Sequence, residues 1–185
     1  MDLRGVILVE GVSDQRAVEA LAARRGRDLE LERVGVVPIG GAQAIDRTLR
    51  RFDPGGSGVR LAGLVDAGEV AHYRRALERA GLGAGLDRAG MERLGFYVCD
   101  ADLEDELIRA LGPAEVERVV AAQGELGSFR TLQKQAPWRD RPPEEQLRRF
   151  MGSGGSRKIR YARLLVEALD PARVPRPLDR VLTHV

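Results

Sequence analysis

The fold of this chain is decided by the stretch Val6-Ile-Leu-Val-Glu-Gly-Val-Ser-Asp14, and its pattern returns in Leu61-Ala-Gly-Leu-Val-Asp66. Each is a short aliphatic run that stops on a carboxylate. Because the apolar residues do not alternate with polar ones, each run is typical of a strand buried on both faces. Ligands collect at the carboxyl ends of such strands in an open α/β sheet. We therefore expect Glu10 and Asp66 side by side at one sheet edge, where two acids repel unless they share a cation.

The remainder of the first two thirds repeats this alternation of strand and helix. Further strands are predicted at 34–39 and 94–99, and helices at 14–25, 42–52, 70–80, 103–111 and 114–123. We expect loops at 53–58 and 81–90, the second with a short turn. Strands that alternate with helices predict an α/β fold: a mainly parallel sheet of about four strands flanked by helices.

The character of the sequence changes after Gly124. Residues 127–143 are polar and show no clear period, 144–150 look helical, and 152–156 are predicted to be a flexible joint. An amphipathic helix is predicted at 158–169, and three prolines are expected to break up the tail. We therefore predict an α/β domain over 1–123 and an Arg-rich helical extension over 124–185 that packs on the domain or completes it.

Composition limits the possible functions. The 185 residues are 43% hydrophobic and 31% charged, with a formal charge of +2, which suits a globular protein and permits nucleic-acid binding without requiring it. The run from 130 to 163 is rich in Arg and poor in acids, which is typical either of a solvated face or of a surface that faces phosphates. The single cysteine, Cys99, excludes an internal disulfide and a Cys-based zinc site. With no apolar run near ~20 residues and no secretion segment, we expect no membrane contact and a cytoplasmic location.

Further acids follow the first and fourth predicted strands. Asp14 lies four residues after Glu10, about one helical turn, so both carboxylates can face one cation; an acid in a first helical turn also stabilises the helix dipole. The segment 100–106 carries five acids. Asp100 is interpreted as a ligand or a helix cap, whereas Asp105 and Glu106 are expected to face solvent.

Four motifs, in this order, resemble the Toprim fold: Val9-Glu-Gly-Val-Ser-Asp14, Gly40-Gly41, Leu64-Val-Asp66 and Asp102-Leu-Glu104. The branch they resemble most is the nuclease half of the overcoming-lysogenization-defect (OLD) endonucleases, over about residues 5–111, with a weaker similarity at 157–165. In that branch the Toprim domain follows an ABC-type ATPase. The sequence has no Gly-x-x-x-x-Gly-Lys-Ser/Thr motif, so we expect a stand-alone Toprim domain.

The resemblance implies a Rossmann-like Toprim fold and metal-dependent hydrolysis of nucleic-acid phosphodiesters, an endonuclease activity with Mg²⁺ or Mn²⁺. Glu10, Asp14, Asp66 and Glu104 would hold the metal, Asp102 lies close enough to share the site, and Glu10, Asp66 and Lys158 would be catalytic. The sequence departs from the family at Gly68, which stands where the family has the second acid of an Asp-x-Asp pair. This departure leaves one-metal and two-metal binding open, and Glu69 is a candidate replacement or simply an acid at a helix start.

Other candidate residues would contact the nucleic acid. Gly40 and Gly41 lie between a strand and a helix, where the backbone can approach a phosphate or simply make a tight turn. Lys158 resembles a C-terminal lysine of this nuclease branch that would stabilise charge on the scissile phosphate, although a solvated lysine is the alternative. Arg157 and Arg160 would contact the phosphate backbone. Trp138 could stack a base, but packing over a helix is the interpretation that we favour at this point.

Other functions stay open. With Gly68 in place of an acid, the chain could be a catalytically weak or inactive module that binds metal or DNA and regulates or partners a separate ATPase. Nucleotidyl transfer, as in Toprim primases, is a further alternative. Tyr73, Tyr97 and Tyr161 are not placed as a topoisomerase requires, so hydrolysis is preferred. We expect nucleic acid, DNA in the first place, as the partner, and the sequence does not decide the oligomeric state.

Overall fold

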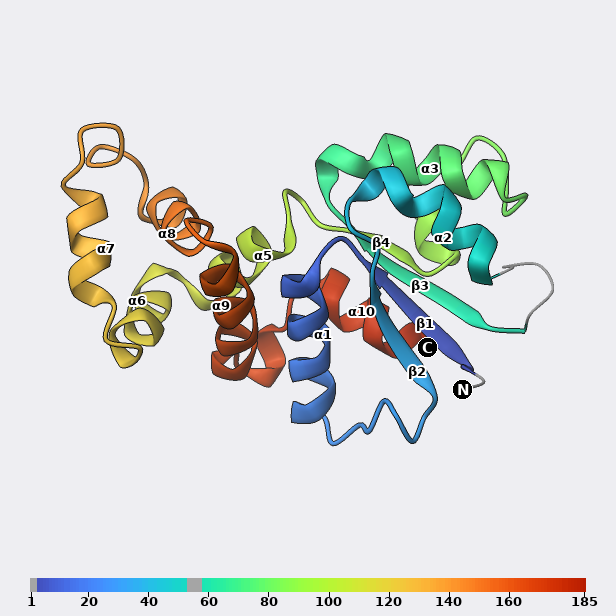
Figure 1. Ribbon diagram of the computed structural model, residues 1–185, viewed down its shortest axis with the longest axis horizontal. Helices are drawn as coiled ribbons and strands as arrows, with labels where there is room; N and C mark the ends of the chain where they lie inside the picture. The colour runs from blue at the N-terminus through green and yellow to red at the C-terminus, as the bar shows by residue number, and fades with distance from the viewer. Residues whose placement is uncertain (1–2, 53–57) are drawn as a thin grey trace.

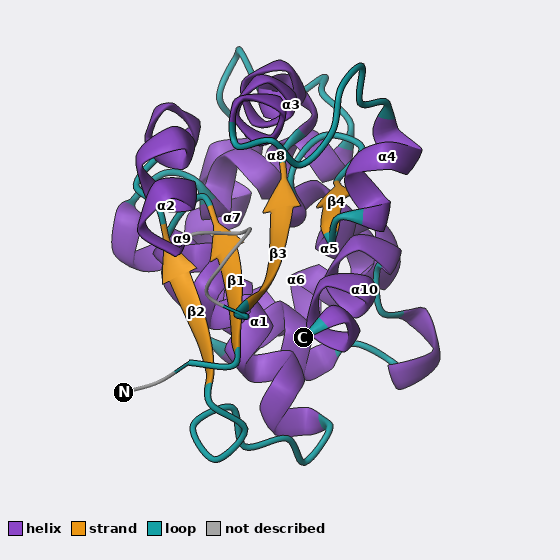
Figure 2. Ribbon diagram, turned by 90° about the vertical axis from the view of Figure 1, so that its right-hand side faces the viewer, coloured by secondary structure: helices purple, strands orange, loops and turns teal. Residues whose placement is uncertain are grey.

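The computed structural model describes residues 3–52 and 58–185. Within these ranges four parallel strands form one sheet in the order β2-β1-β3-β4. They are β1 (Gly5–Val9), β2 (Val34–Pro38), β3 (Arg60–Val65) and β4 (Phe96–Val98). The predicted α/β fold with a parallel sheet of about four strands is confirmed. All carboxyl ends of the strands point to the same edge (Figures 1 and 2).

Both faces of the sheet are covered, as the unbroken aliphatic runs predict. Val6 and Leu8 point to one face, where α2 (Ile45–Phe52), α3 (Val70–Arg79) and α4 (Arg88–Arg93) pack. Ile7 and Val9 point to the other face, against α1 (Val12–Arg24) and α10 (Arg176–His184). All five residues of β1 are buried, so the acids that follow it are held on a rigid frame.

From Leu103 onward the elements of the chain are helices joined by turns and loops. Its helices are α5 (Leu103–Leu111), α6 (Pro113–Ala122), α7 (Leu126–Gln133), α8 (Pro143–Met151) and α9 (Gly155–Ala168), with α10 at the end. Helix α9 lies along α1, whereas α6, α7 and α8 form a lobe that stands away from the sheet (Figure 1). Short 3-10 turns lie at Ala42–Ala44, Ala67–Glu69 and Pro171–Arg173.

The structure corrects several expectations for the loops. The stretch 127–143 contains most of α7, and the tail contains α10, whose prolines lie at the helix start, where a missing N–H costs nothing. The predicted loop 81–90 includes the start of α4, which Asp87 caps by accepting a hydrogen bond from the Gly90 amide at 2.7 Å. In the predicted joint at 152–156, Gly152 ends α8 and α9 already begins at Gly155.

Two further points concern the rest of the chain. Most of the loop expected at 53–58, namely 53–57, lies outside the described residues. Among the residues that the structure does describe, no helix is long and apolar enough to cross a membrane.

Candidate metal centre

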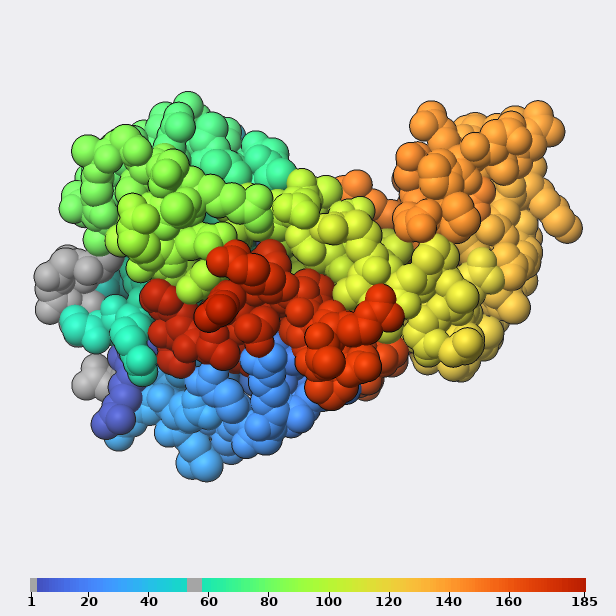
Figure 3. Space-filling view, turned by 180° about the vertical axis from the view of Figure 1, so that it is seen from behind, coloured from blue at the N-terminus to red at the C-terminus, as the bar shows by residue number. Residues whose placement is uncertain are grey.

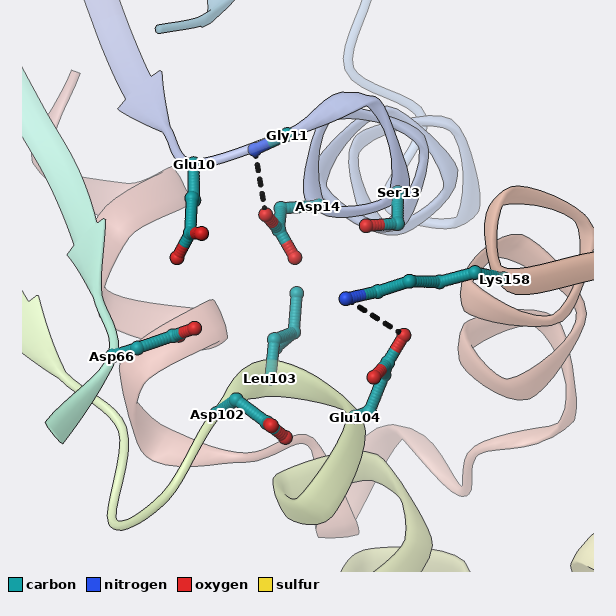
Figure 4. A pocket seen from close by; sticks show the side chains of 9 residues that line it. All are labelled: Glu10, Gly11, Ser13, Asp14, Asp66, Asp102, Leu103, Glu104 and Lys158. Atoms are coloured by element: carbon teal, nitrogen blue, oxygen red, sulfur yellow. Dashed lines mark hydrogen bonds and ion pairs between the residues drawn. The ribbon is translucent and has the colours of Figure 1, made fainter. Parts of the chain in front are cut away.

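The carboxyl edge of the sheet carries a small acidic cavity of about 60 Å³. We call it the acidic cavity. Its charged lining residues are Glu10, Asp14, Asp66, Asp102, Glu104 and Lys158. The rest of the lining comes from Gly11, Ser13 and Leu103. Figure 4 shows the carboxylates turned toward a common space, with Lys158 entering from the opposite side. The volume is enough for a few water molecules or a hydrated cation, not for an organic ligand.

The first two acids are placed by the junction of β1 and α1. Glu10 directly follows the last buried residue of β1, and the amides of Gly40 and Gly41 donate hydrogen bonds to its carbonyl oxygen at 3.1 and 3.3 Å. Asp14 lies in the first turn of α1, where it accepts a hydrogen bond from the Gly11 amide at 3.0 Å. The strand and helix thus fix the backbone of both acids at the same edge.

The glycine pair therefore has a local role that differs from the predicted phosphate contact. Its amides hold the backbone of Glu10, and its φ angles of +76° and +103° are in the region that favours glycine. Neither Gly40 nor Gly41 lines the acidic cavity.

The other acids come from β3 and α5. Asp66 follows β3 directly. Asp102 caps α5 by accepting a hydrogen bond from the Asp105 amide at 2.9 Å through Oδ1, and its Oδ2 pairs with Arg148 of α8. Glu104 lies in the first turn of α5, and its carboxylate is mostly buried. Both oxygens of Asp102 are therefore engaged by protein groups, whereas Asp66 faces another acid, Glu10.

Lys158 is the cation among the residues that line the cavity. It lies in the first turns of α9, and its Nζ is 3.3 Å from Oε1 of Glu104. That oxygen is buried and accepts no hydrogen bond with good geometry in the described part of the chain, so the ion pair leaves part of its bonding capacity unused.

The electrostatics of the cavity favour a bound cation. Burial, followed by the charges of Asp14 and Glu10, raises the pKa of Asp66 to about 8. Burial also raises the pKa values of Asp14 and Glu104, although Lys158 opposes this for both. Burial disfavours the charged form of Lys158, but Glu104 and Asp14 outweigh it and raise the pKa of the ammonium group. Burial and mutual repulsion make it unfavourable for all these carboxyl groups to be ionised at once. A divalent cation bound among them would stabilise their ionised forms.

The acids fit a hard divalent cation by chemistry, but they are not arranged as a finished coordination shell. In the ranges 3–52 and 58–185, no group of three or more His, Cys, Asp or Glu side chains is positioned as a ready-formed metal site. The oxygen donors, the shared cavity and the unused Glu104 Oε1 nevertheless suit Mg²⁺ or Mn²⁺, which take carboxylate and water ligands.

Besides Gly40 and Gly41, three of the predicted site residues do not line this cavity: Glu69, Arg157 and Arg160. Glu69 is in the turn after Asp66, with its carboxylate 4.0 Å from His72 Nε2. Apart from the chain neighbours of Gly68, no atom of the described residues lies within 4 Å of where its Cβ would be, so an acid would fit there. Arg157 and Arg160 both pair with Glu125, at 3.1 and 2.5 Å.

In the segment 100–106 the structure differs from one expectation, the exposure of Glu106. Asp100 is exposed and pairs with Arg88 and Arg109 at 3.5 and 3.4 Å. Glu106 was expected to face solvent, but it is buried, and the hydrogen bond that its carboxylate accepts from the Asp100 amide at 2.8 Å compensates for the burial. This hydrogen bond stabilises the turn between β4 and α5.

Two residues near the cavity were not predicted as site residues. Arg148 is close to Asp102 only because α8 folds back over α5; the Arg-rich run was the one signal for it. The hydroxyl of Tyr73 is buried and has no hydrogen-bond partner within the described residues. Burial, reinforced by Glu10 and Asp66, raises its pKa, so the phenol stays protonated.

Comparisons with known proteins agree with this fold. Residues 3–67 match the family model for the Toprim domain of overcoming-lysogenization-defect-like proteins. The C-terminal region of the OLD protein of Xanthomonas campestris pv. campestris is similar with a TM-score of 0.76 and 24% identity, covering 99% of this chain and 92% of that one. The C-terminal region of the Burkholderia pseudomallei OLD protein gives a TM-score of 0.70 at 20% identity, covering 99% and 98%. No curated protein matches. The predicted resemblance to an OLD-like Toprim domain is thereby confirmed over residues 3–67, and the predicted fold over nearly the whole chain.

Proposed function

We propose that this chain, an OLD-like Toprim domain by its matched segment and its fold, is a metal-dependent nuclease that hydrolyses nucleic-acid phosphodiester bonds. One observation carries the proposal: five carboxylates and one lysine surround a single cavity at the carboxyl edge of a parallel sheet. A nuclease needs negative ligands for a divalent metal and a cation for the phosphate, and this cavity offers both.

Glu10, Asp14, Asp66 and Glu104 would hold Mg²⁺ or Mn²⁺, with Asp102 as an outer partner that also caps α5. When bound, the metal would polarise the phosphate and lower the pKa of a water molecule, which becomes the nucleophile. Glu69 is 38% exposed in its side chain and faces His72, so its contribution to the metal is a secondary part of the proposal.

The chain's own residues would position and neutralise the phosphate. Lys158 would leave its ion pair with Glu104 for a non-bridging phosphate oxygen, where charge builds up during the reaction. The Gly40 and Gly41 amides would keep Glu10 in place through its carbonyl. Arg157 and Arg160 would contact the nucleic-acid backbone only if they exchanged their partner Glu125 for a phosphate.

A second candidate function is a catalytically weak or inactive module that binds metal or DNA and regulates or partners a separate ATPase. Gly68 favours it, because one acid of the family's pair is missing. The lack of a ready-formed metal site within the described residues favours it too. These observations predict weak metal binding rather than none.

The test is cleavage of supercoiled plasmid with Mg²⁺ or Mn²⁺ by the wild type, Glu10→Gln and Asp66→Asn. Glu19→Gln is a matched control, because Glu19 is an acid of α1 that pairs with Arg16 on the surface. We expect metal-dependent cleavage that both cavity variants lose and the control keeps. Metal binding by calorimetry without cleavage would instead favour the regulatory module. Cleavage that survives in both cavity variants would reject the acidic cavity as the active site.

A further inference from the structure

A larger groove opens directly beside the acidic cavity. It has a volume of about 540 Å³ and shares Asp102, Glu104 and Lys158 with the cavity. Its other wall comes from the helical lobe: Trp138, Glu145, Arg148, Arg149 and Gly152. Figure 3 shows the lobe, in orange and yellow, standing away from the rest of the molecule with a notch between them. Because the groove and the cavity share these residues, a ligand bound at the cavity could extend into the groove and contact the helical lobe.

Trp138 is held in that wall by a buried polar side chain. Gln146 is only 5% exposed, and its amide donates a hydrogen bond to the Trp138 carbonyl at 2.7 Å. Its own oxygen accepts a hydrogen bond from Gln133 Nε2, also at 2.7 Å. Burying an amide is unfavourable unless it is fully bonded, so this network fixes the backbone of a segment that has no helix of its own. The indole is thus positioned, and it is not fully buried.

Positive charge lies next to the indole. The guanidinium carbon of Arg149 is 5.7 Å from the centre of the Trp138 ring, and both residues line the groove. Arg148 extends from the same helix to Asp102 at the rim of the acidic cavity. An aromatic face with an arginine beside it is the combination that binds a base and its phosphate in single-stranded nucleic acid.

The dimensions favour one nucleotide over a duplex. A space of about 540 Å³ is in the range of pockets that hold one small organic ligand. A duplex would keep its bases stacked on each other and away from the indole.

We propose that this groove binds one unpaired nucleotide next to the scissile phosphate, with its base on Trp138 and its phosphate toward Arg149. The substrate would then be single-stranded, or unpaired at the point of cleavage. This inference rests on the proposed nuclease function for the position of the scissile phosphate.

The chain offers a direct probe, because Trp138 is its one tryptophan. Its intrinsic fluorescence is titrated with an oligothymidylate and with a blunt duplex of the same length, in Ca²⁺ so that binding is observed without relying on turnover. We expect saturable quenching by the single strand and little by the duplex. Unchanged emission while a labelled single strand binds, or equal quenching by both, would overturn the proposal.

Variants extend the test with a labelled oligothymidylate and fluorescence anisotropy. Trp138→Leu is expected to weaken binding by about 5- to 150-fold, the equivalent of ~1–3 kcal/mol for one stacked base, and Trp138→Phe to retain most of the affinity. Lys134→Gln is the matched control, a charge change on the same lobe outside the groove. If Trp138→Leu melts normally and binds like the wild type, the proposal fails.

Failure of this inference is distinguishable from failure of the nuclease function. Plasmid cleavage by the wild type without quenching of Trp138 would keep the nuclease and remove the nucleotide site. Selective quenching without any cleavage would keep the nucleotide site and remove the hydrolysis.

Discussion

Lys158 Nζ lies 3.3 Å from Glu104 Oε1, which joins the start of α9 to the first turn of α5 across the acidic cavity. The two residues are far apart in sequence; the Glu104 side chain is only 12% exposed, whereas that of Lys158 is 44% exposed. Because Glu104 and Asp14 raise the pKa of Lys158, its ammonium group stays charged beside the proposed metal ligands. A phosphate that enters the cavity can then take the place of Glu104.

Lys158→Met is therefore expected to lower the cleavage rate by about 10²- to 10³-fold, the usual effect of losing one group that stabilises transition-state charge. Metal affinity should hold or increase, since a positive charge leaves the ligands. The measurement is plasmid cleavage together with Mn²⁺ calorimetry. Arg163→Gln, which removes a surface cation of α9 paired with Glu167, is the control. A parallel loss of metal affinity would contradict this role.

Asp66→Asn should stabilise the protein in EDTA. An acid whose pKa is raised to about 8 binds its proton more tightly in the folded state than in the unfolded chain, so folding stability falls as pH rises from about 4 to about 8. The Asn variant has no carboxyl group at this position, so its folding stability does not fall in this way as pH rises. Its melting temperature should exceed that of the wild type at pH 8, by about 2–4 °C for each kcal/mol, and should change less with pH. Added Mn²⁺ should stabilise the wild type only; equal stabilisation of both would exclude Asp66 as a ligand.

Gly68→Asp should tighten metal binding. In the part of the chain that the structure describes, only the chain neighbours of Gly68 come within 4 Å of where its Cβ would lie, so an aspartate can be added without a clash two residues from Asp66. We expect about tenfold higher Mn²⁺ affinity, the equivalent of ~1.4 kcal/mol. Calorimetry checks this, and Gly68→Ala separates the carboxylate from the loss of backbone freedom. Unchanged affinity would show that the missing acid of the family pair is not what limits binding.

Tyr73→Phe should leave cleavage intact. The hydroxyl is buried, has no hydrogen-bond partner among the described residues, and stays protonated, so it is not a covalent nucleophile. Removing an unpaired buried hydroxyl should raise the free energy of unfolding, by up to ~1–3 kcal/mol. Urea unfolding and plasmid cleavage measure the two effects. Lost cleavage in a stable variant would point to a chemical role for the phenol.

Glu125→Gln should alter acid stability. A hydrogen bond from the Tyr161 hydroxyl, with Arg157 and Arg160, lowers the pKa of Glu125. The stabilisation that its charge provides is therefore present above the ordinary carboxyl range and is lost as pH falls through the lowered pKa. Compared with the wild type, the variant should unfold at a lower urea midpoint at pH 7, and its midpoint should decline less between pH 7 and pH 3. Glu115→Gln, which removes an exposed partner of Arg118, should show neither effect.

The sequence alone determined the strands and the acids that follow them. Val6–Val9 and Leu61–Val65 are aliphatic without alternation, which is typical of a strand buried on both faces, and parallel strands bring their carboxyl ends to one edge. This local rule is enough to put Glu10, Asp14 and Asp66 around one cavity. By contrast, α7 and α10 were missed because proline and polar residues at a helix start look like breaks until packing shows the buried face.

Only the tertiary structure decided what surrounds these acids. The folding of α9 along α1 and of α8 over α5 carries Lys158, Arg148 and Trp138 to the cavity and its groove. Local sequence does not predict that these three residues lie near the acids, because their positions depend on how apolar faces of helices far apart in the chain pack together. The acids are thus fixed by strand ends, whereas the cations and the aromatic side chain that complete the candidate site are fixed by the core.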